Sequence, residues 1–167
     1  MRFTSDELEP LDQYYATREL AKECCDLLDF TKYSTILEPS AGTGVFLEFL
    51  PREKTQAIDI DPKHPDIIKM DFFDYSNSAE LVVGGPPFGD TAKIAVRFFN
   101  KAAVFANTIA FILPRTINRS HIVVKLNKNF HKTHEHYIPP SKFIPPETAA
   151  HCYFQIWERR EYERNDR

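Results

Sequence analysis

The sequence predicts an α/β fold of three layers, in which helices cover both faces of a mostly parallel sheet. Short runs of β-branched and apolar residues indicate five strands, at residues 34–37, 55–60, 67–70, 81–83 and 108–113. Apolar residues recur at helical spacing at 17–29, where Thr17 occupies the N-cap position, and again at 91–106. Apolar strands that alternate with helices are typical of a parallel sheet covered on both sides.

The second half of the chain predicts three more elements. They are a helix at 117–130 and a closing pair of strands at 134–138 and 152–158, the last of them antiparallel. The connections at 61–66 and 72–79 leave little room for the crossover helices that parallel strands normally use. We therefore expect a reduced version of the fold, as one domain over residues 1–167 with a frayed tail at 161–167.

Composition excludes several classes of protein. The chain has 167 residues, 43% of them hydrophobic, which is enough to bury one core. A charged fraction of 27% and a net charge of −3 exclude a disordered polyelectrolyte and a histone-like basic protein. No apolar run approaches the ~20 residues of a membrane helix, and the N-terminus lacks the apolar stretch of a signal peptide. The lack of a long apolar run predicts that the protein has no membrane partner. The three cysteines without CxxC spacing favour a reduced, intracellular protein, which we expect in the cytoplasm.

Charge is distributed unevenly along the chain. Residues 1–30 carry eight acidic and three basic side chains, whereas residues 115–136 carry five basic side chains, four histidines and one glutamate. The second stretch could contact phosphates, or it could be an ordinary solvated helix face.

The segment EPSAGTG at residues 38–44 is the first candidate site. Glu38 ends a predicted strand, Pro39, Ser40 and Ala41 form a small-residue turn, and a helix is expected to open near Gly44. Gly42 and Gly44 would let a ligand approach the backbone, at the end of the sheet where open α/β sheets bind ligands. The two glycines alone are equally consistent with a tight turn. An acid beside the turn repels phosphates and favours a cation.

Two further acids end the next two strands. Asp59, followed by Ile60, is placed to accept hydrogen bonds from both hydroxyls of a ribose. Asp71 and Phe72 would suit an adenine amino group and its ring face. The structural alternatives are a turn ahead of Pro62 for Asp59 and a core aromatic for Phe72.

The fourth strand ends in GGPPFG at residues 84–89. Consecutive prolines cannot extend a strand ladder, so Pro86 and Pro87 predict a rigid turn with Phe88 displayed beyond it. The alternative is that the prolines only terminate the strand.

In this order, the motifs resemble those of S-adenosylmethionine-dependent amino-methyltransferases that modify adenine N6 in DNA or RNA, including small phage- and giant-virus-like members. EPSAGTG is similar to their cofactor motif, AIDID (57–61) to their ribose acid, MDF (70–72) to their adenine contact, and GPPF (85–88) to their catalytic Asn/Asp-Pro-Pro-aromatic motif. DQYYAT (12–17) is similar to a segment that helps hold the methionine end, which implies cofactor contacts for Tyr15 and Thr17. CYFQIWER (152–159) resembles their last strand.

The resemblance covers residues 12–160 and implies a Rossmann-like class I methyltransferase fold, S-adenosylmethionine as the cofactor and nucleic acid as the partner. It also implies that the Pro86 carbonyl accepts a hydrogen bond from the target amino group and that Phe88 stacks on a base that has left its helix. Target specificity would then be low, or supplied by a partner subunit or by a second copy in a homodimer.

Gly85 departs from the pattern, because it stands where the motif has Asn or Asp. Loss of one positioned polar group typically lowers the rate by ~10²–10³. Three explanations are open: a water or Asp90 replaces the missing oxygen, the site binds cofactor without efficient catalysis, or the chain is an engineered inactive form. Besides an active enzyme, the sequence therefore allows a weak or inactive methyltransferase-like subunit that binds nucleic acid or an active partner.

Two other readings are less favoured. Methylation of a protein glutamine by the related Asn-Pro-Pro-aromatic enzymes usually goes with a motif that ends in tyrosine, whereas this motif ends in Phe88. His131, His134 and His136 have no acidic or cysteine partner at a zinc-site spacing, so we predict no metal.

Overall fold

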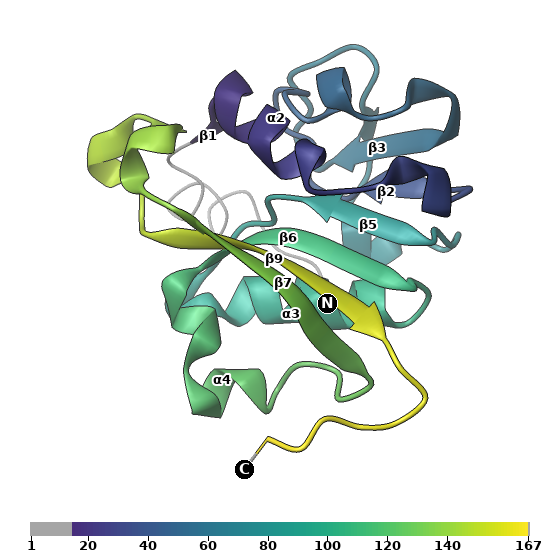
Figure 1. Ribbon diagram of the computed structural model, residues 1–167. Helices are drawn as coiled ribbons and strands as arrows, with labels where there is room; N and C mark the ends of the chain where they lie inside the picture. The colour runs from purple at the N-terminus through teal and green to yellow at the C-terminus, as the bar shows by residue number, and fades with distance from the viewer. Residues whose placement is uncertain (1–14, 167) are drawn as a thin grey trace.

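The computed structural model describes residues 15–166 (Figure 1). Its main feature is a seven-stranded sheet in the order β4-β3-β2-β5-β6-β9-β7. Taken in that order, the strands are β4 (Ile68–Lys69), β3 (Thr55–Asp59), β2 (Ile36–Glu38), β5 (Leu81–Gly84), β6 (Thr108–Pro114), β9 (Cys152–Arg159) and β7 (Phe130–Ile138). All neighbouring pairs are parallel except the two that involve β9. This confirms the predicted α/β sheet with an antiparallel last strand.

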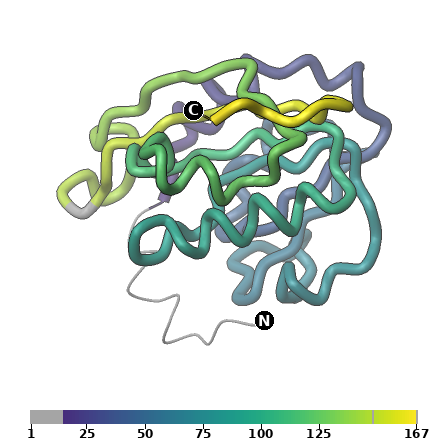
Figure 2. The backbone as a smooth tube through the Cα atoms, turned by 90° about the horizontal axis from the view of Figure 1, so that it is seen from below, coloured from purple at the N-terminus to yellow at the C-terminus, as the bar shows by residue number. Residues whose placement is uncertain are grey.

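Each face of the sheet has its own hydrophobic core, because successive strand residues point to opposite sides. Leu81 and Val83 of β5 pack into the core that includes helix α2 (Arg18–Asp26), whereas Val82 packs into the core that includes helix α3 (Lys93–Ala103). Figure 1 shows the two helices on opposite sides of the sheet, and Figure 2 shows α3 running along it. The three predicted layers are therefore present.

Helix α2 begins where the sequence predicts. Thr17 is its N-cap, and the Thr17 hydroxyl accepts a hydrogen bond from the Leu20 amide at 3.2 Å. The helix ends at Asp26, three residues before the predicted end. The amides of Leu27 and Leu28 close the last turn on the carbonyls of Cys24 and Cys25.

Two predicted helices are absent from the described residues. The helix expected near Gly44 is replaced by one 3-10 turn at Leu47–Phe49, because Pro51 follows closely and disfavours helical backbone before it. The helix expected at 117–130 is replaced by a 3-10 helix at Arg115–Asn118 and the short α4 (Ser120–Val123). Its second half contains Asn127, whose side chain accepts the Asn129 amide at 3.0 Å, a local bond that competes with helix.

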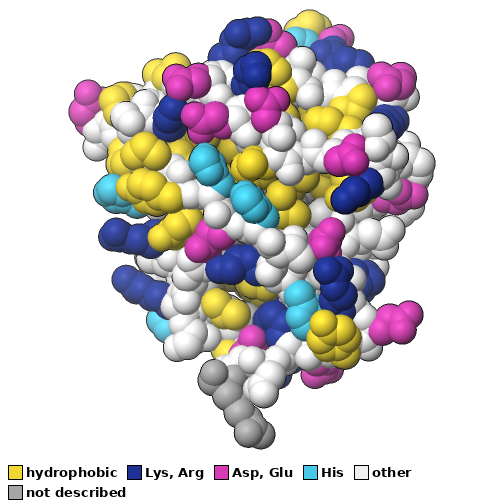
Figure 3. All heavy atoms as spheres, viewed as in Figure 1, with side chains coloured by type: hydrophobic (Ala, Val, Ile, Leu, Met, Phe, Trp, Pro, Cys, Tyr) yellow, Lys and Arg dark blue, Asp and Glu magenta, His cyan; other side chains and the backbone are white. Residues whose placement is uncertain are grey.

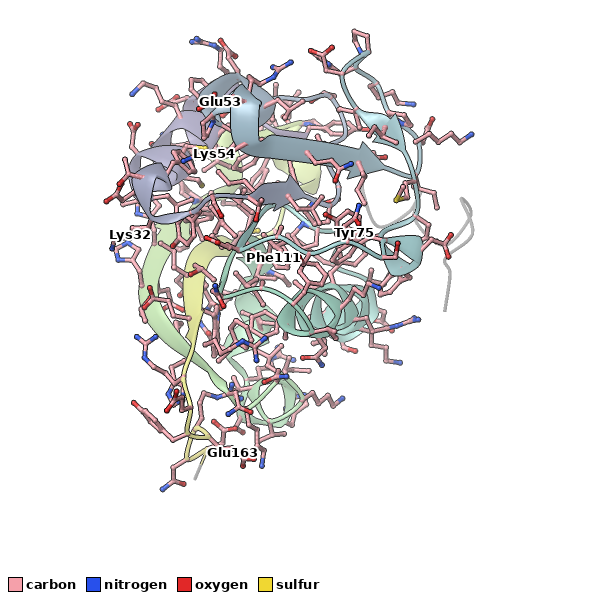
Figure 4. The ribbon with its side chains drawn as sticks, turned by 90° about the vertical axis from the view of Figure 1, so that its right-hand side faces the viewer. Lys32, Glu53, Lys54, Tyr75, Phe111 and Glu163 are labelled. Atoms are coloured by element: carbon pink, nitrogen blue, oxygen red, sulfur yellow. The ribbon has the colours of Figure 1, made fainter. Side chains whose placement is uncertain are left out.

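The short connections after β3 and after β4 lack crossover helices, as predicted. Residues 60–67 join β3 to β4 without a helix, and one 3-10 turn at Phe72–Asp74 follows β4. Tyr75 comes next and is buried, with its ring 5.7 Å from that of Phe105; Figure 4 shows Tyr75 near α3 on this side of the molecule. Aromatic side chains thus cover the sheet where a helix would.

The C-terminal tail is anchored, in contrast to the predicted fraying at 161–167. The Arg164 guanidinium is largely buried, donates hydrogen bonds to carbonyls at the end of the α4 region, and lies 5.2 Å from the Trp157 ring. Its carbonyl acceptors belong to Val123, Leu126, Asn127 and Phe130. One arginine therefore satisfies the backbone groups that the missing helix leaves open. Residue 167 lies outside the described part of the chain.

A second, two-stranded sheet closes the fold near the N-terminus. Strand β1 (Tyr15–Ala16) pairs antiparallel with β8 (Phe143–Ile144), which lies in the loop between β7 and β9. The Thr17 amide and hydroxyl both donate to the Lys142 carbonyl, at 3.1 and 2.9 Å. These contacts hold the start of α2 against the 139–151 loop, beside the carboxyl ends of the parallel strands.

Candidate functional site

A hollow lies at the carboxyl ends of β2 and β5, the two strands at which the strand order reverses. It holds about 640 Å³, counting the space open to solvent at its mouth. Open α/β sheets place their ligands at this point. Three segments form most of its wall: the turn after β2, the turn after β5, and the β1–β8 pair.

The turn after β2 is held by the neighbouring strand. The Ala41 amide donates to the Ile58 carbonyl at 2.9 Å, and the Gly42 amide donates to the Asp59 carboxylate at 2.8 Å. Gly44 has φ +81°, and a Cβ at this position would lie 3.0 Å from the His64 ring, so only glycine fits without adjustment. The predicted residues Ser40, Ala41 and Gly42 line the hollow, whereas Pro39 and Gly44 shape the turn behind it.

Glu38 is the most unusual group in the wall. Its side chain lines the hollow but is only 1% exposed, and its Oε2 has no hydrogen-bond partner within the described residues. Burial, with a smaller contribution from the nearby charge of Asp59, raises the pKa of Glu38 from 4.5 to about 8. Burial deprives the Glu38 carboxyl group of the water that would normally solvate it. A hydrogen-bond donor or a cation that enters the hollow would therefore stabilise the group.

The turn after β5 faces that carboxyl group. Gly85, Pro86, Pro87 and Phe88 all line the hollow, which brings together the two motifs predicted from sequence. The Ser40 hydroxyl donates to the Gly85 carbonyl at 3.1 Å and joins one turn to the other.

The Phe88 carbonyl anchors the far end of this turn, because it accepts the amides of Ile94 and Ala95, both at 3.0 Å. These amides belong to the first turn of α3, whose N–H groups have no partner within the helix. The double-proline turn is therefore fixed at both ends.

Gly85 leaves space where the related motif has a side chain. A Cβ built on Gly85 would meet only Ile112, at 3.9 and 4.0 Å, which is ordinary van der Waals contact. Ile112 of β6 is buried and also lines the hollow. Asp90, which the sequence offers as a substitute for the missing oxygen, is exposed and does not line the hollow.

The third part of the wall comes from Tyr15 and Ala16 of β1 and from Phe143 of β8. Tyr15 is where the sequence predicts a cofactor contact. Thr17 lies behind the wall, where its hydroxyl caps α2 and holds Lys142. Sequence reasoning missed Phe143, although its setting between two proline pairs at 139–140 and 145–146 indicates a stiffened loop.

The remaining predicted cofactor residues lie outside the lining. Asp59 accepts the Gly42 amide through Oδ2 and the Asp61 amide through Oδ1, both at 2.8 Å, and Ile60 follows it. A carboxylate has about four lone-pair sites, so Asp59 keeps capacity for a ribose hydroxyl at the edge of the turn.

Asp71 and Phe72 are used structurally in this chain. Asp71 caps a 3-10 turn by accepting the Phe73 amide at 2.9 Å. Phe72 is 2% exposed, with its ring 5.2 Å from that of Phe98. The Phe72 ring is therefore in the core beside α3, as the core-aromatic alternative expects, and its contact with an adenine ring stays a prediction.

Neither a metal centre nor a membrane span occurs among the described residues. No group of three or more potential metal ligands comes together there, and no helix is long and apolar enough to cross a bilayer. His131 contacts the Tyr162 carbonyl at 2.9 Å and His136 contacts Glu23 at 3.3 Å, so these two histidines contact different parts of the surface.

The sequence matches no protein-family model and no curated protein. Solved structures with a similar fold include three methyltransferases. One is a candidate RNA methyltransferase from Pyrococcus horikoshii (TM-score 0.64, 19% identity, 92% of this chain and 88% of that one). Another is the 23S rRNA methyltransferase ErmE (TM-score 0.64, 15% identity, 88% and 70%). The third is the N-methyltransferase NodS from Bradyrhizobium japonicum in complex with S-adenosyl-L-homocysteine (TM-score 0.60, 15% identity, 95% and 94%). The chain therefore has the Rossmann-like fold of class I methyltransferases.

Proposed function

We propose that this protein is a methyltransferase that uses S-adenosylmethionine and acts on nucleic acid, with the N6 amino group of adenine as the target. The observation that carries the proposal is the single hollow into which the Glu38 turn and the double-proline turn both open. Two structural neighbours with this fold are named as RNA methyltransferases, one of them as a candidate, and a third binds the demethylated form of this cofactor. The motif order in the sequence supports the adenine target.

The residues of the hollow fit this cofactor. Glu38 offers a buried carboxyl oxygen without a partner, which suits the ammonium group of the methionine part. Gly42 and Ser40 bring backbone and hydroxyl groups to the surface of the hollow, and Tyr15 and Phe143 add aromatic walls. Asp59 would bind the ribose from the edge of the turn. The bound cofactor supplies an activated methyl group, and the protein supplies orientation and exclusion of water.

The double-proline turn would position the acceptor base. Prolines at 86 and 87 have no amide hydrogen, so the turn offers carbonyl oxygens but few donors to a substrate amine. In our proposal the Pro86 carbonyl accepts a hydrogen bond from the amino group and the Phe88 ring lies against the base. Because the turn is bonded to Ser40 and to the first turn of α3, it keeps its geometry when substrate enters.

Gly85 favours a second candidate function. With no side-chain acceptor at this position, the amino group is held by fewer hydrogen bonds, which lowers the rate. A weak or inactive subunit that binds nucleic acid, or that works with an active partner or a second copy, would keep the pocket and lose the transfer step.

Calorimetry and a transfer assay separate the two candidates. Wild type and Gly85→Asn are titrated with S-adenosylmethionine, and transfer of radiolabelled methyl groups to adenine-containing DNA and RNA is measured. We expect both proteins to bind the cofactor, and Gly85→Asn to transfer ~10-fold or more faster, because the structure has room for the new side chain. Transfer by the variant alone favours the second candidate.

Failure of wild type and variant to bind the cofactor would overturn the proposal. Glu38→Ala serves as the matched control, because it removes the partner of the ammonium group and should weaken cofactor binding. Labelling of added protein instead of nucleic acid would keep the enzyme class but refute the substrate.

A further inference from the structure

Two exposed aromatic rings lie side by side near the end of β7. Tyr137 is 47% exposed, and its hydroxyl lies 2.5 Å from Nδ1 of His151, which is also exposed. The ring planes differ by 19° and their centres are 5.9 Å apart. A hydrogen bond to Nδ1 lies near the plane of the imidazole. With nearly parallel planes, it therefore sets the rings edge to edge. The two rings present one flat surface.

The surface is supported from behind. Tyr153 of β9 is paired with Tyr137 in the sheet register, and its ring contacts the Tyr137 ring at 5.8 Å and 64°. The His151 carbonyl accepts the Arg115 amide at 3.0 Å, which fixes the backbone beside the other ring. Rings held in this way lose little conformational freedom when a flat ligand stacks on them.

The ring pair lies on the same edge of the sheet as the pocket. Ile112 lines the pocket and is paired with Phe154, whereas His151 immediately precedes the first residue of β9. With about 3.3 Å per residue along a strand and about 4.8 Å between strands, both rings are attached roughly 10 Å from Ile112. Tyr137 is in register with Tyr153 and Leu113, which points to the α3 side of the sheet, whereas Ile112 points to the α2 side. A strand of nucleic acid would therefore reach the rings around the carboxyl edge of the sheet, where Phe88 packs against both cores.

Basic side chains accompany the rings. Arg115 and Arg119 are exposed, and within residues 15–166 neither guanidinium forms an ion pair. Lys132, in contrast, is paired with Glu135 at 2.8 Å. Figure 3 shows histidine and Lys or Arg side chains beside a hydrophobic patch at the left of this face, over the 139–151 loop and the segment below it. The surface therefore combines flat rings with positive charge.

We infer that Tyr137 and His151 stack on an unpaired base next to the target nucleotide, and that Arg115 and Arg119 contact the adjoining phosphates. This inference rests on the proposed function and specifies its substrate as single-stranded or locally opened nucleic acid, because paired bases hide their faces within the duplex. Stacking on an aromatic ring tolerates any base, so this surface adds affinity without sequence specificity.

Binding of a fluorescent single-stranded oligonucleotide to the full chain tests the inference. Anisotropy is measured with wild type, Tyr137→Ala, His151→Ala and Tyr137→Phe at several salt concentrations. We expect Tyr137→Ala to weaken binding about 5- to 100-fold, His151→Ala to weaken it less, and Tyr137→Phe to retain most of it, because the ring remains. Arg115→Ala and Arg119→Ala should each lower the slope of log affinity against log salt by about 0.7.

Matched controls come from elsewhere on the surface. Tyr162 is 65% exposed and contacts His131 with a ring distance of 4.7 Å, so Tyr162→Ala removes a similar ring pair away from the pocket. Lys32 is exposed near the amino end of β2, at the opposite end of the parallel strands, and Lys32→Ala removes one positive charge there. Both controls should bind the oligonucleotide like wild type.

The outcomes separate this inference from the proposed function. Unchanged binding by both Tyr137→Ala and His151→Ala, or equal binding of a fully paired duplex, would overturn the stacking surface while methyl transfer to nucleic acid still stood. Wild-type protein that binds S-adenosylmethionine but no oligonucleotide would overturn both the surface and the nucleic-acid substrate. Loss of cofactor binding in Tyr137→Ala would assign the residue to the pocket instead, and would also contradict the inference.

Discussion

Glu38→Gln tests whether the buried carboxyl group is held in an unfavourable state until a ligand enters. Glu38 has a folded-state pKa of about 8 against 4.5 in the unfolded chain. Between these values the folded protein keeps the proton that the unfolded chain releases, so stability falls as pH rises from about 5 to 8 and is level above that. The glutamine variant has no such titration.

The size of the effect follows from the shift. One pKa unit corresponds to about 1.4 kcal/mol, so the loss is at most about 5 kcal/mol at pH 8 and about 3 kcal/mol at pH 6.5. The buried amide of glutamine also has unsatisfied groups, which cost about 1–3 kcal/mol at every pH. The variant can therefore be less stable than wild type at pH 5, and the informative quantity is the slope of the difference.

Urea unfolding followed by tryptophan fluorescence measures this slope. Trp157 is the only tryptophan in the chain and is 3% exposed, so its emission reports loss of the core. We expect the unfolding free energy of Glu38→Gln, minus that of wild type, to rise by several kcal/mol between pH 5 and 8. Glu53→Gln is the control, because Glu53 is exposed on the 3-10 turn at the amino end of β3, whereas the hollow lies at the carboxyl ends of the strands (Figure 4). A difference that stays constant with pH would refute the reasoning.

Two further predictions concern groups that hold the fold around the site. Arg164→Ala should lower the unfolding free energy by about 3 kcal/mol, because it leaves carbonyls at the end of the α4 region without a donor. Arg160→Ala, which removes a half-exposed pair with Glu158, should change it by less than about 1 kcal/mol. Equal effects of the two substitutions in urea unfolding would argue against the anchoring role. Asp59→Asn should weaken S-adenosylmethionine binding in calorimetry and shift the pH-dependent loss of stability to lower pH, since the Asp59 charge contributes to the raised pKa of Glu38. An unchanged pH profile would contradict that coupling.

The sequence was sufficient to predict the centre of the sheet and both turns of the pocket. β5 and β6 are continuous apolar runs buried on both faces, and such runs are recognisable without any tertiary information. The two turns follow directly from strand ends marked by small residues or by prolines. Parallel strands end at the same edge of a sheet, so both turns were expected at that edge. That β2 and β5 are neighbours, which brings the turns together, is given by the structure.

What could not be predicted depends on contacts between distant segments. Phe143 enters the wall only because β8 pairs with β1. Thr17 lies outside the lining of the hollow, where its hydroxyl donates to the Lys142 carbonyl. Phe72 follows an acid at a strand end, as a nucleoside-stacking residue would. Its ring packs against Phe98 in the aromatic core beside α3. The helix predicted at 117–130 is also interrupted, and Arg164, from the far end of the chain, satisfies the carbonyls that the interruption leaves open.

The adjacent glycines at the end of β5 have different functions in this arrangement. Gly84 has φ +145°, and a Cβ there would lie 3.0 Å from Cγ of Glu38, so any side chain would push against the buried carboxyl group. Gly85 has no such neighbour, and a side chain there would extend beside Ile112 into the hollow. The first glycine therefore leaves room for the buried carboxyl group, whereas in the proposed function the second determines how the acceptor is held. Substitution at Gly85 would therefore alter the proposed methyl-transfer step without disturbing Glu38.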